Sequence, residues 1–172
     1  STGVGLDCRK YSPYSLYDEF EFDVPIGKYG DNYDRYFCRM REMEESLRIL
    51  GQLDPLLRAS VGEDVIVEDS RMVLPPKSEV YSNIEALMNH FKIIMEGVRP
   101  PKGECYHAVE GANGELGFYI VSDGTGMPYK ARCRPPSFVN MGSVHLQLLG
   151  SQIADIVPIF GQINMIGGEC DR

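Results

Sequence analysis

The residues with the clearest potential for chemistry lie at the end of the chain, which reads Gly161-Gln-Ile-Asn-Met-Ile-Gly-Gly-Glu-Cys-Asp-Arg172. This stretch follows an apolar run and closes on three charged residues, Glu169, Asp171 and Arg172. Chain ends are usually loose unless contacts hold them in place. The combination of apolar residues, paired glycines and a terminal ion-pair candidate therefore predicts a docked tail, inserted into a buried cavity where the function lies.

The histidines and cysteines of the chain form no recognisable catalytic or metal-binding motif. No GxSxG elbow or HExxH pair occurs, so we interpret the histidines as structural. The nearest two cysteines are 28 positions apart, which leaves no CxxC motif for zinc or an iron–sulfur cluster. The residues concerned are His90, His107 and His145, and Cys8, Cys38, Cys105, Cys133 and Cys170.

Composition narrows the class of protein. A formal net charge of −8 in 172 residues argues against a nucleic-acid interface, which requires a basic stripe. No run of about 18 apolar residues is present, as a membrane span would need. At 43% hydrophobic and 24% charged, the chain resembles an ordinary globular protein, and we predict a single domain over residues 1–172.

The elements expected to position the tail are helices and a small sheet. Apolar residues at helical spacing predict helices, and period-two patterns between glycine-rich turns predict strands. We predict an α+β fold, mainly helical, with core helices and a small antiparallel three-stranded sheet. The expected helices are 32–50, 82–97, 139–149 and 151–160; the expected sheet strands are 106–110, 115–122 and 129–134, with further short strands at 20–24 and 65–67.

Two of these helices carry distinct signals. The first has an apolar stripe that we expect to pack in the core, while Gly51 and Pro55 end the helix. The second, over 82–97, begins with Ser82 and Glu85, whose spacing of three residues is a capping-box pattern. The stripe of the first helix is Tyr33, Phe37, Met40, Met43, Leu47 and Leu50.

Several stretches together resemble the 49 kDa-type (D-type) subunit of respiratory complex I, the NADH–quinone oxidoreductase. The resemblance extends over nearly the whole chain, in order, and implies that the chain is the C-terminal half of such a subunit. The stretches that carry it are Gly3-Val-Gly-Leu-Asp-Cys-Arg-Lys10, Phe22-Asp-Val-Pro-Ile-Gly27, Gly30-Asp-Asn-Tyr-Asp-Arg-Tyr36, Ile84-Glu-Ala-Leu-Met-Asn-His-Phe-Lys92, Gly114-Glu-Leu-Gly-Phe-Tyr-Ile-Val-Ser-Asp-Gly124, Arg134-Pro-Pro-Ser-Phe138 and Gly168-Glu-Cys-Asp-Arg172.

The resemblance implies a fold like that of the nickel–iron hydrogenase large subunit and a role in the quinone-reducing site. The substrate is then quinone, this chain binds no metal, and an iron–sulfur cluster in a neighbouring subunit supplies electrons. The expected partners are other peripheral-arm subunits, including the one with the terminal cluster, and membrane-arm subunits, without nucleic acid. The expected location is peripheral, on the cytoplasmic face of the bacterial inner membrane, or the matrix or stromal side in an organelle.

The same resemblance assigns roles within the tail. The quinone-cavity lining would comprise Ile163, Asn164, Met165, Ile166 and Gly167, with Glu169, Asp171 and Arg172 as a structural, charged tail; no catalytic residue is assigned. A quinone slot is mostly apolar, and glycine permits close backbone approach.

Some positions depart from the family pattern. Asn164 stands where the family usually has aspartate, and an amide cannot accept a proton at neutral pH. Cys170 stands where the family usually has a small aliphatic residue, and Gly167 stands where it usually has a large apolar one. Gly111-Ala-Asn113 stands in place of the usual Ala-Pro-Lys or Ala-Pro-Arg.

Two alternatives stay open. One is a subunit of a related membrane-bound hydrogenase or of a ferredoxin- or deazaflavin-linked complex, although Cys170 alone does not supply the thiolates of a nickel site. The other is a non-catalytic scaffold of such a complex. In each case we expect exposed apolar surface where the N-terminal half and the partners would pack.

Overall fold

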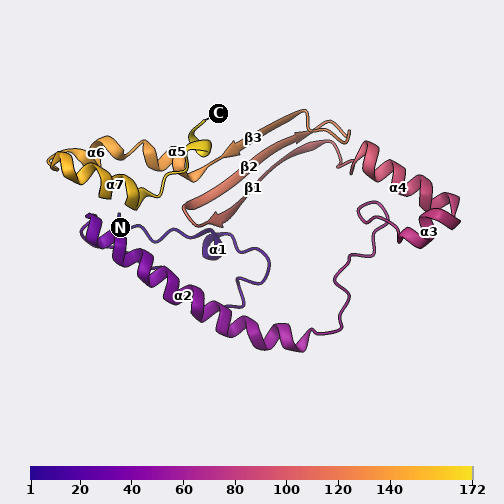
Figure 1. Cartoon of the computed structure of the whole chain (residues 1–172), viewed down its shortest axis with the longest axis horizontal. Helices are drawn as coiled ribbons and strands as arrows, with labels where there is room; N and C mark the ends of the chain where they lie inside the picture. The colour runs from indigo at the N-terminus through magenta and orange to yellow at the C-terminus, as the bar shows by residue number, and fades with distance from the viewer. Residues whose placement is uncertain (172) are drawn as a thin grey trace. The chain divides into compact units, whose positions relative to one another are not determined.

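The central sheet has three strands in the order β1-β2-β3, formed by Gly103–Gly111, Gly114–Ser122 and Lys130–Arg134 (Figure 1). A two-residue turn, Ala112-Asn113, joins the first two strands as an antiparallel hairpin, and Gly114 takes a left-handed φ of 128° that favours glycine. The three predicted strands and the α+β class are confirmed.

The structure, a computed structural model, describes residues 1–171, and their contacts divide them into two units. The first unit comprises Ser1–Ala59, His107–Gly117 and the chain from Cys133 onward. The second comprises Ser60–Tyr106 and Phe118–Arg132. The single-domain organisation stays a prediction, and each unit is described by itself.

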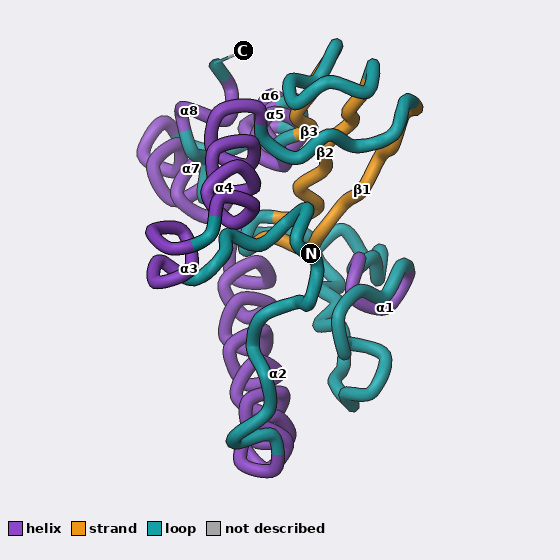
Figure 2. Tube along the Cα trace, turned by 90° about the vertical axis from the view of Figure 1, so that its right-hand side faces the viewer, coloured by secondary structure: helices purple, strands orange, loops and turns teal. Residues whose placement is uncertain are grey.

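Helix α2 of the first unit spans Asn32–Ala59 and is longer than predicted (Figure 2). The expected end near Leu50 is wrong because neither Gly51 nor Pro55 breaks the helix. Proline removes the hydrogen bond to the carbonyl four residues earlier, here that of Gly51. Since Gly51 is exposed, water can satisfy that carbonyl, and the helix continues for another turn.

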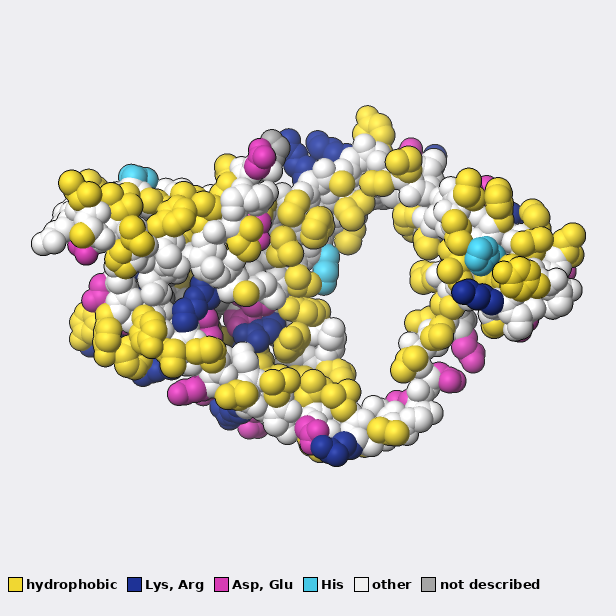
Figure 3. Space-filling view, in the orientation of Figure 1, with side chains coloured by type: hydrophobic (Ala, Val, Ile, Leu, Met, Phe, Trp, Pro, Cys, Tyr) yellow, Lys and Arg dark blue, Asp and Glu magenta, His cyan; other side chains and the backbone are white. Residues whose placement is uncertain are grey.

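The apolar stripe of α2 is exposed, so its predicted place in a core is wrong for this structure. Ile49 is the one buried residue of the helix, whereas the six stripe residues named above are all exposed. Periodicity shows that a face suits burial but does not name the covering element. The expected exposed apolar surface is confirmed, and Figure 3 shows such side chains over much of one face.

The N-terminal segment lies along α2 and forms no strand, so the strand predicted over residues 20–24 is wrong. The backbone N–H of Glu21 donates to Gln52 (2.9 Å), whose amide returns a bond to the Glu21 carbonyl (2.7 Å). The N–H of Asp23 donates to the Glu45 carboxylate at 2.9 Å. Helix side chains therefore take the backbone bonds that a neighbouring strand would have formed.

In the second unit, α3 (Lys77–Ser82) is followed by α4 (Ile84–Glu96). The helix over 82–97 is confirmed in its position, but the predicted capping box is wrong. The side chain of Asn83, which lies between the two helices, accepts the N–H of Glu85 at 2.9 Å and caps α4. The strand predicted over 65–67 is also wrong, because its side chains are exposed and it forms no ladder.

The remaining helices of the first unit are short. They are α1 (Cys8–Tyr11), α5 (Pro136–Met141), α6 (Val144–Leu148), the 3₁₀ turn η1 (Ile153–Asp155), α7 (Ile156–Ile163) and α8 (Gly167–Cys170). The single helix predicted over 139–149 is thus two helices, α5 and α6. Pro158 lies in the first turn of α7, where its missing N–H requires no bend. Ile159 and Ile163 bury the inner face of α7. Among residues 1–171, no helix is long and apolar enough to cross a membrane.

Candidate functional site

The tail turns sharply at Asn164, which ends α7 with φ 53° and ψ 49°. Asparagine is one of the few residues besides glycine that tolerate this left-handed conformation. Ile163 before it is buried, Met165 after it is half-buried, and Ile166 keeps 49% of its surface exposed. Asn164 and Gly167 are exposed. Of the predicted lining residues, only Ile163 is therefore buried, and three of the other four are exposed.

Glu169 fastens the tail to helix α5. Its Oε2 accepts the backbone N–H of Ser137 at 3.0 Å, and the Ser137 Oγ accepts the backbone N–H of Ile166 at 3.3 Å. Ser137 is only 1% exposed. Of the predicted charged tail, Glu169 thus has a structural partner, Asp171 is exposed, and Arg172 lies outside the described residues.

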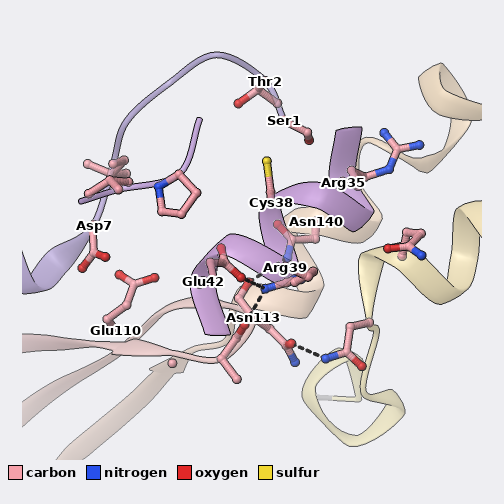
Figure 4. Close-up of a pocket in the computed structure, with 18 of the residues that line it drawn as sticks. Ser1, Thr2, Asp7, Arg35, Cys38, Arg39, Glu42, Glu110, Asn113 and Asn140 are labelled. Carbon is pink, nitrogen blue, oxygen red and sulfur yellow. Dashed lines mark hydrogen bonds and ion pairs between the residues drawn. The ribbon is translucent and has the colours of Figure 1, made fainter. Parts of the chain in front are cut away.

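The turn between β1 and β2 braces three helices of the first unit. Asn164 donates from Nδ2 to the Asn113 Oδ1 at 2.6 Å, and Asn140 donates to the Asn113 carbonyl at 3.1 Å. Arg39 of α2 donates to the Ala112 carbonyl at 2.9 Å, as the close-up shows (Figure 4). The turn therefore connects α2, α5 and the end of α7.

A cavity of about 710 Å³ lies beside this turn, bounded by α2, the N-terminal segment and the helices α5 to α7. Ile163 and Asn164 line it, whereas Met165, Ile166 and Gly167 do not. Most of the residues that line it are polar or charged, and Figure 4 shows carboxylates, guanidinium groups and amides around it. Its charged lining residues are Asp7, Arg9, Asp23, Arg35, Arg39, Glu42, Glu45 and Glu110.

At one wall of this cavity, Asp7 and Arg9 form a partly buried ion pair at 2.7 Å. Burial raises the pKa of Asp7, but hydrogen bonds and the charge of Arg9 outweigh it and lower the pKa overall. The Arg9 guanidinium also lies 4.7 Å from the ring centre of Phe22, which is 2% exposed. This pair therefore fixes the N-terminal segment as well as the cavity wall.

The neighbouring residue, Cys8, contacts the sheet. Its backbone N–H donates to Glu110 Oε2 at 2.9 Å, and the Glu110 N–H donates to the Tyr14 hydroxyl oxygen at 3.1 Å. Burial and the Glu110 carboxylate raise the pKa of the Cys8 thiol to about 11. Cys8 is consequently a neutral, packed thiol at physiological pH.

The described residues contain no group of three or more histidines, cysteines or carboxylates placed to hold a metal ion. The residues that the sequence analysis missed are Ser137 and Asn113, which hold the tail. One signal for the first was available: Pro135 and Pro136 open α5 without a side chain that can cap it. That absence predicts a partner from elsewhere in the chain.

Comparison with known proteins places the chain among subunits of respiratory-chain oxidoreductases. The sequence model of the family described as Respiratory-chain NADH dehydrogenase, 49 Kd subunit, matches residues 1–172. The chain belongs to this family, which confirms the resemblance seen in its sequence.

Three similar proteins are considerably longer than this chain. A D-type subunit of the NADH-quinone oxidoreductase of Sorangium cellulosum is 53% identical over all of this chain and 42% of its own length. The D-type subunit of Myxococcus xanthus is 51% identical over 99% of this chain and 40% of its own length. The combined C/D-type subunit of Bdellovibrio bacteriovorus is 49% identical over 99% of this chain and 30% of its own length. The chain thus spans about two-fifths of the first two.

Proposed function

We propose that this chain forms part of the quinone-binding and quinone-reducing site of an NADH–quinone oxidoreductase of the complex I type. There it would support electron transfer from an iron–sulfur cluster in a neighbouring subunit to quinone. The observation that carries the proposal is the match along 99–100% of the chain to proteins named as D-type subunits of NADH-quinone oxidoreductase.

Within the chain, the quinone would contact the tail at the exposed Ile166, with the half-buried Met165 beside it. Quinone rings and prenyl chains are apolar and favour mostly apolar slots. Ile166 offers apolar surface of this kind, since about half of its side chain is exposed. The charged cavity on the other side of Asn164 is a poor match for such a molecule, because its lining groups would lose hydration without gaining partners.

Asn164 would serve this site through hydrogen bonding. One N–H of its amide is used by Asn113, and the amide has a second donor that can reach a quinone carbonyl. An amide does not exchange protons at neutral pH. The proton that reduction requires would therefore come from another group, and no catalytic residue is assigned to this chain.

The proposed partners are the other peripheral-arm subunits, including the one that holds the terminal iron–sulfur cluster, and the membrane-arm subunits. The C/D-type relative supports a C-type neighbour, because its name combines both types in one polypeptide. The exposed apolar faces of α2 and α4 support extensive contacts with other protein surfaces. The location would be peripheral, on the cytoplasmic face of a bacterial inner membrane.

The test is Ile166→Trp in the assembled complex that contains this chain. The larger side chain would obstruct the slot, and we expect the KM for quinone to rise by about tenfold or more, the range typical of a misfitted apolar pocket. NADH oxidation with a water-soluble artificial acceptor should be unchanged. The matched control is Ile153→Trp, on a residue that is 87% exposed in η1.

Each outcome has a distinct meaning. If Ile166→Trp leaves the KM for quinone and the sensitivity to quinone-site inhibitors at control values, the tail does not line the site. If the complex with the unaltered chain reduces no quinone, and both variants assemble normally, the chain serves as a scaffold. Activity with reduced ferredoxin but not with NADH would indicate the related ferredoxin-linked class.

A further inference from the structure

We propose that Ser137, together with Glu169, is a positioning residue that holds the segment Asn164–Gly167 in place for its contact with quinone. This inference rests on the proposed function and adds two residues to it. Neither residue would touch the quinone. Both would act by fixing the tail against helix α5.

The central observation is the pair of opposite hydrogen bonds at Ser137. Its backbone N–H donates to Glu169, and its hydroxyl oxygen accepts from the backbone N–H of Ile166. Ser137 is 1% exposed, so its own donor and acceptor are shielded from water, although each bond is only partly buried at the tail. Buried polar groups are costly to leave unpaired, and each bond therefore favours the docked tail over a detached one.

Glu169 also satisfies a requirement of α5. The first N–H groups of a helix need acceptors from outside the helix, and Pro135 at the N-cap forms no side-chain bond. Pro136 has no N–H, so Ser137 carries the first free donor of the helix. The Glu169 carboxylate, 32 residues further along the chain, accepts it. A negative charge is also favourable at a helix N-terminus.

The other end of the segment is held independently. Asn164 donates to Asn113, and the carbonyl of Asn113 accepts from Asn140 of α5. The buried side chain of Ile163 anchors the residue before the turn. Because the segment is fixed at both ends, the left-handed turn at Asn164 has one defined direction, and Ile166 is presented at a defined place.

The experiment compares Ser137→Ala, Glu169→Ala and Glu169→Gln in the assembled complex. Ser137→Ala removes the acceptor for Ile166 but keeps the N–H donor. Glu169→Ala removes the cap of α5, while Glu169→Gln retains a carbonyl acceptor and should restore much of the lost function. The matched control is Ser82→Ala, since that hydroxyl donates to carbonyls of its own helix, those of Ser78 and Glu79.

Two measurements are made on each variant. Hydrogen exchange of the peptide covering residues 161–171 reports whether the tail is held; loss of one buried bond should accelerate it about fivefold to tenfold. The KM for quinone should rise about fivefold or more, while kcat stays within about twofold, because a displaced tail weakens the binding of quinone. A residue with a merely structural role would lower the amount of assembled complex without changing the KM.

Faster exchange with a raised KM, partly restored in Glu169→Gln, supports the proposal. Exchange at control values in Ser137→Ala and Glu169→Ala overturns it, because the bonds then do not hold the tail. Faster exchange with an unchanged KM also overturns it, because the tail is then held for another purpose. These results differ from a failure of the proposed function, which would appear as an ineffective Ile166→Trp.

Discussion

Replacing Asp7 with asparagine tests how the N-terminal segment is held in the first unit. The Asp7 carboxylate accepts the Arg9 backbone N–H (2.9 Å) and two guanidinium N–H groups, from Nε (3.0 Å) and Nη2 (2.7 Å). The bond from the Arg9 backbone N–H is the one that caps α1 (Cys8–Tyr11). Because asparagine is an equally good N-cap, the variant removes the charge while keeping the cap.

The expected loss follows from the burial of the pair. The Asp7 side chain is 8% exposed and that of Arg9 is 23% exposed. Removing one partner of a buried pair costs about 3–5 kcal/mol, and the partial exposure of Arg9 reduces this. We therefore expect Asp7→Asn to lower the free energy of unfolding by about 2–3 kcal/mol at pH 7, near the range for hydrogen bonds to charged groups.

The control is a second pair with the same local geometry. Asp69 accepts the backbone N–H of Arg71 (2.9 Å), its Nε (3.0 Å) and its Nη2 (2.8 Å). Hydrogen bonds from Arg71 lower the pKa of Asp69 to about 2. The Arg71 side chain is 83% exposed, however. Exposed pairs contribute little to stability, so Asp69→Asn should scarcely change the unfolding curve.

Urea unfolding of the purified chain, followed by circular dichroism, provides the measurement. A loss of this size shifts the midpoint by about 1 M for a typical slope. The pKa of Asp7 is lowered in the folded state, so its contribution is fully present above the ordinary aspartate pKa of about 4. It is lost as the pH falls through the lowered pKa. Equal effects of Asp7→Asn and Asp69→Asn, or an Asp7→Asn effect that does not diminish as the pH is lowered below about 4, would refute this reasoning.

Two further predictions concern single positions. Because burial and Glu110 raise the pKa of Cys8 to about 11, alkylation at pH 8 followed by mass spectrometry should label the exposed Cys105 and Cys133 well before Cys8; equal labelling rates would contradict its burial. Gly51→Ala should raise the free energy of unfolding by about 0.5–1 kcal/mol, since a Cβ there meets nothing within 4 Å in the middle of α2; a lower urea midpoint would show that Gly51 serves another purpose.

Local signals in the sequence were reliable where neighbours in the chain make the structure. The β1–β2 hairpin was predictable because its glycine-rich turn and alternating strands are adjacent. The end of α4 at Gly97, with φ 72°, follows the same logic. The extent of α2 was not predictable from Pro55. Whether a proline breaks a helix depends on whether the carbonyl four residues earlier, here that of Gly51, finds another hydrogen-bond donor.

Contacts between distant residues set the limits of prediction. The exposed stripe of α2 had the pattern of a core face, since hydrophobic spacing does not reveal which element covers it. The bond from Ser137 to Glu169 joins residues 32 positions apart, and no local pattern specifies such a partner. The sequence thus indicated the tail as a candidate site, which stays a prediction, but it did not indicate the residues that hold the tail.

The remote cap of α5 has a consequence for the order in which the protein is made. Synthesis proceeds from the N-terminus, at about 5–20 residues per second, and structure forms as segments become available. The donor on Ser137 has no Glu169 to bind until the chain has been extended by a further 32 residues. Helix α5 and the tail therefore reach their final arrangement together, only after Glu169 has been made.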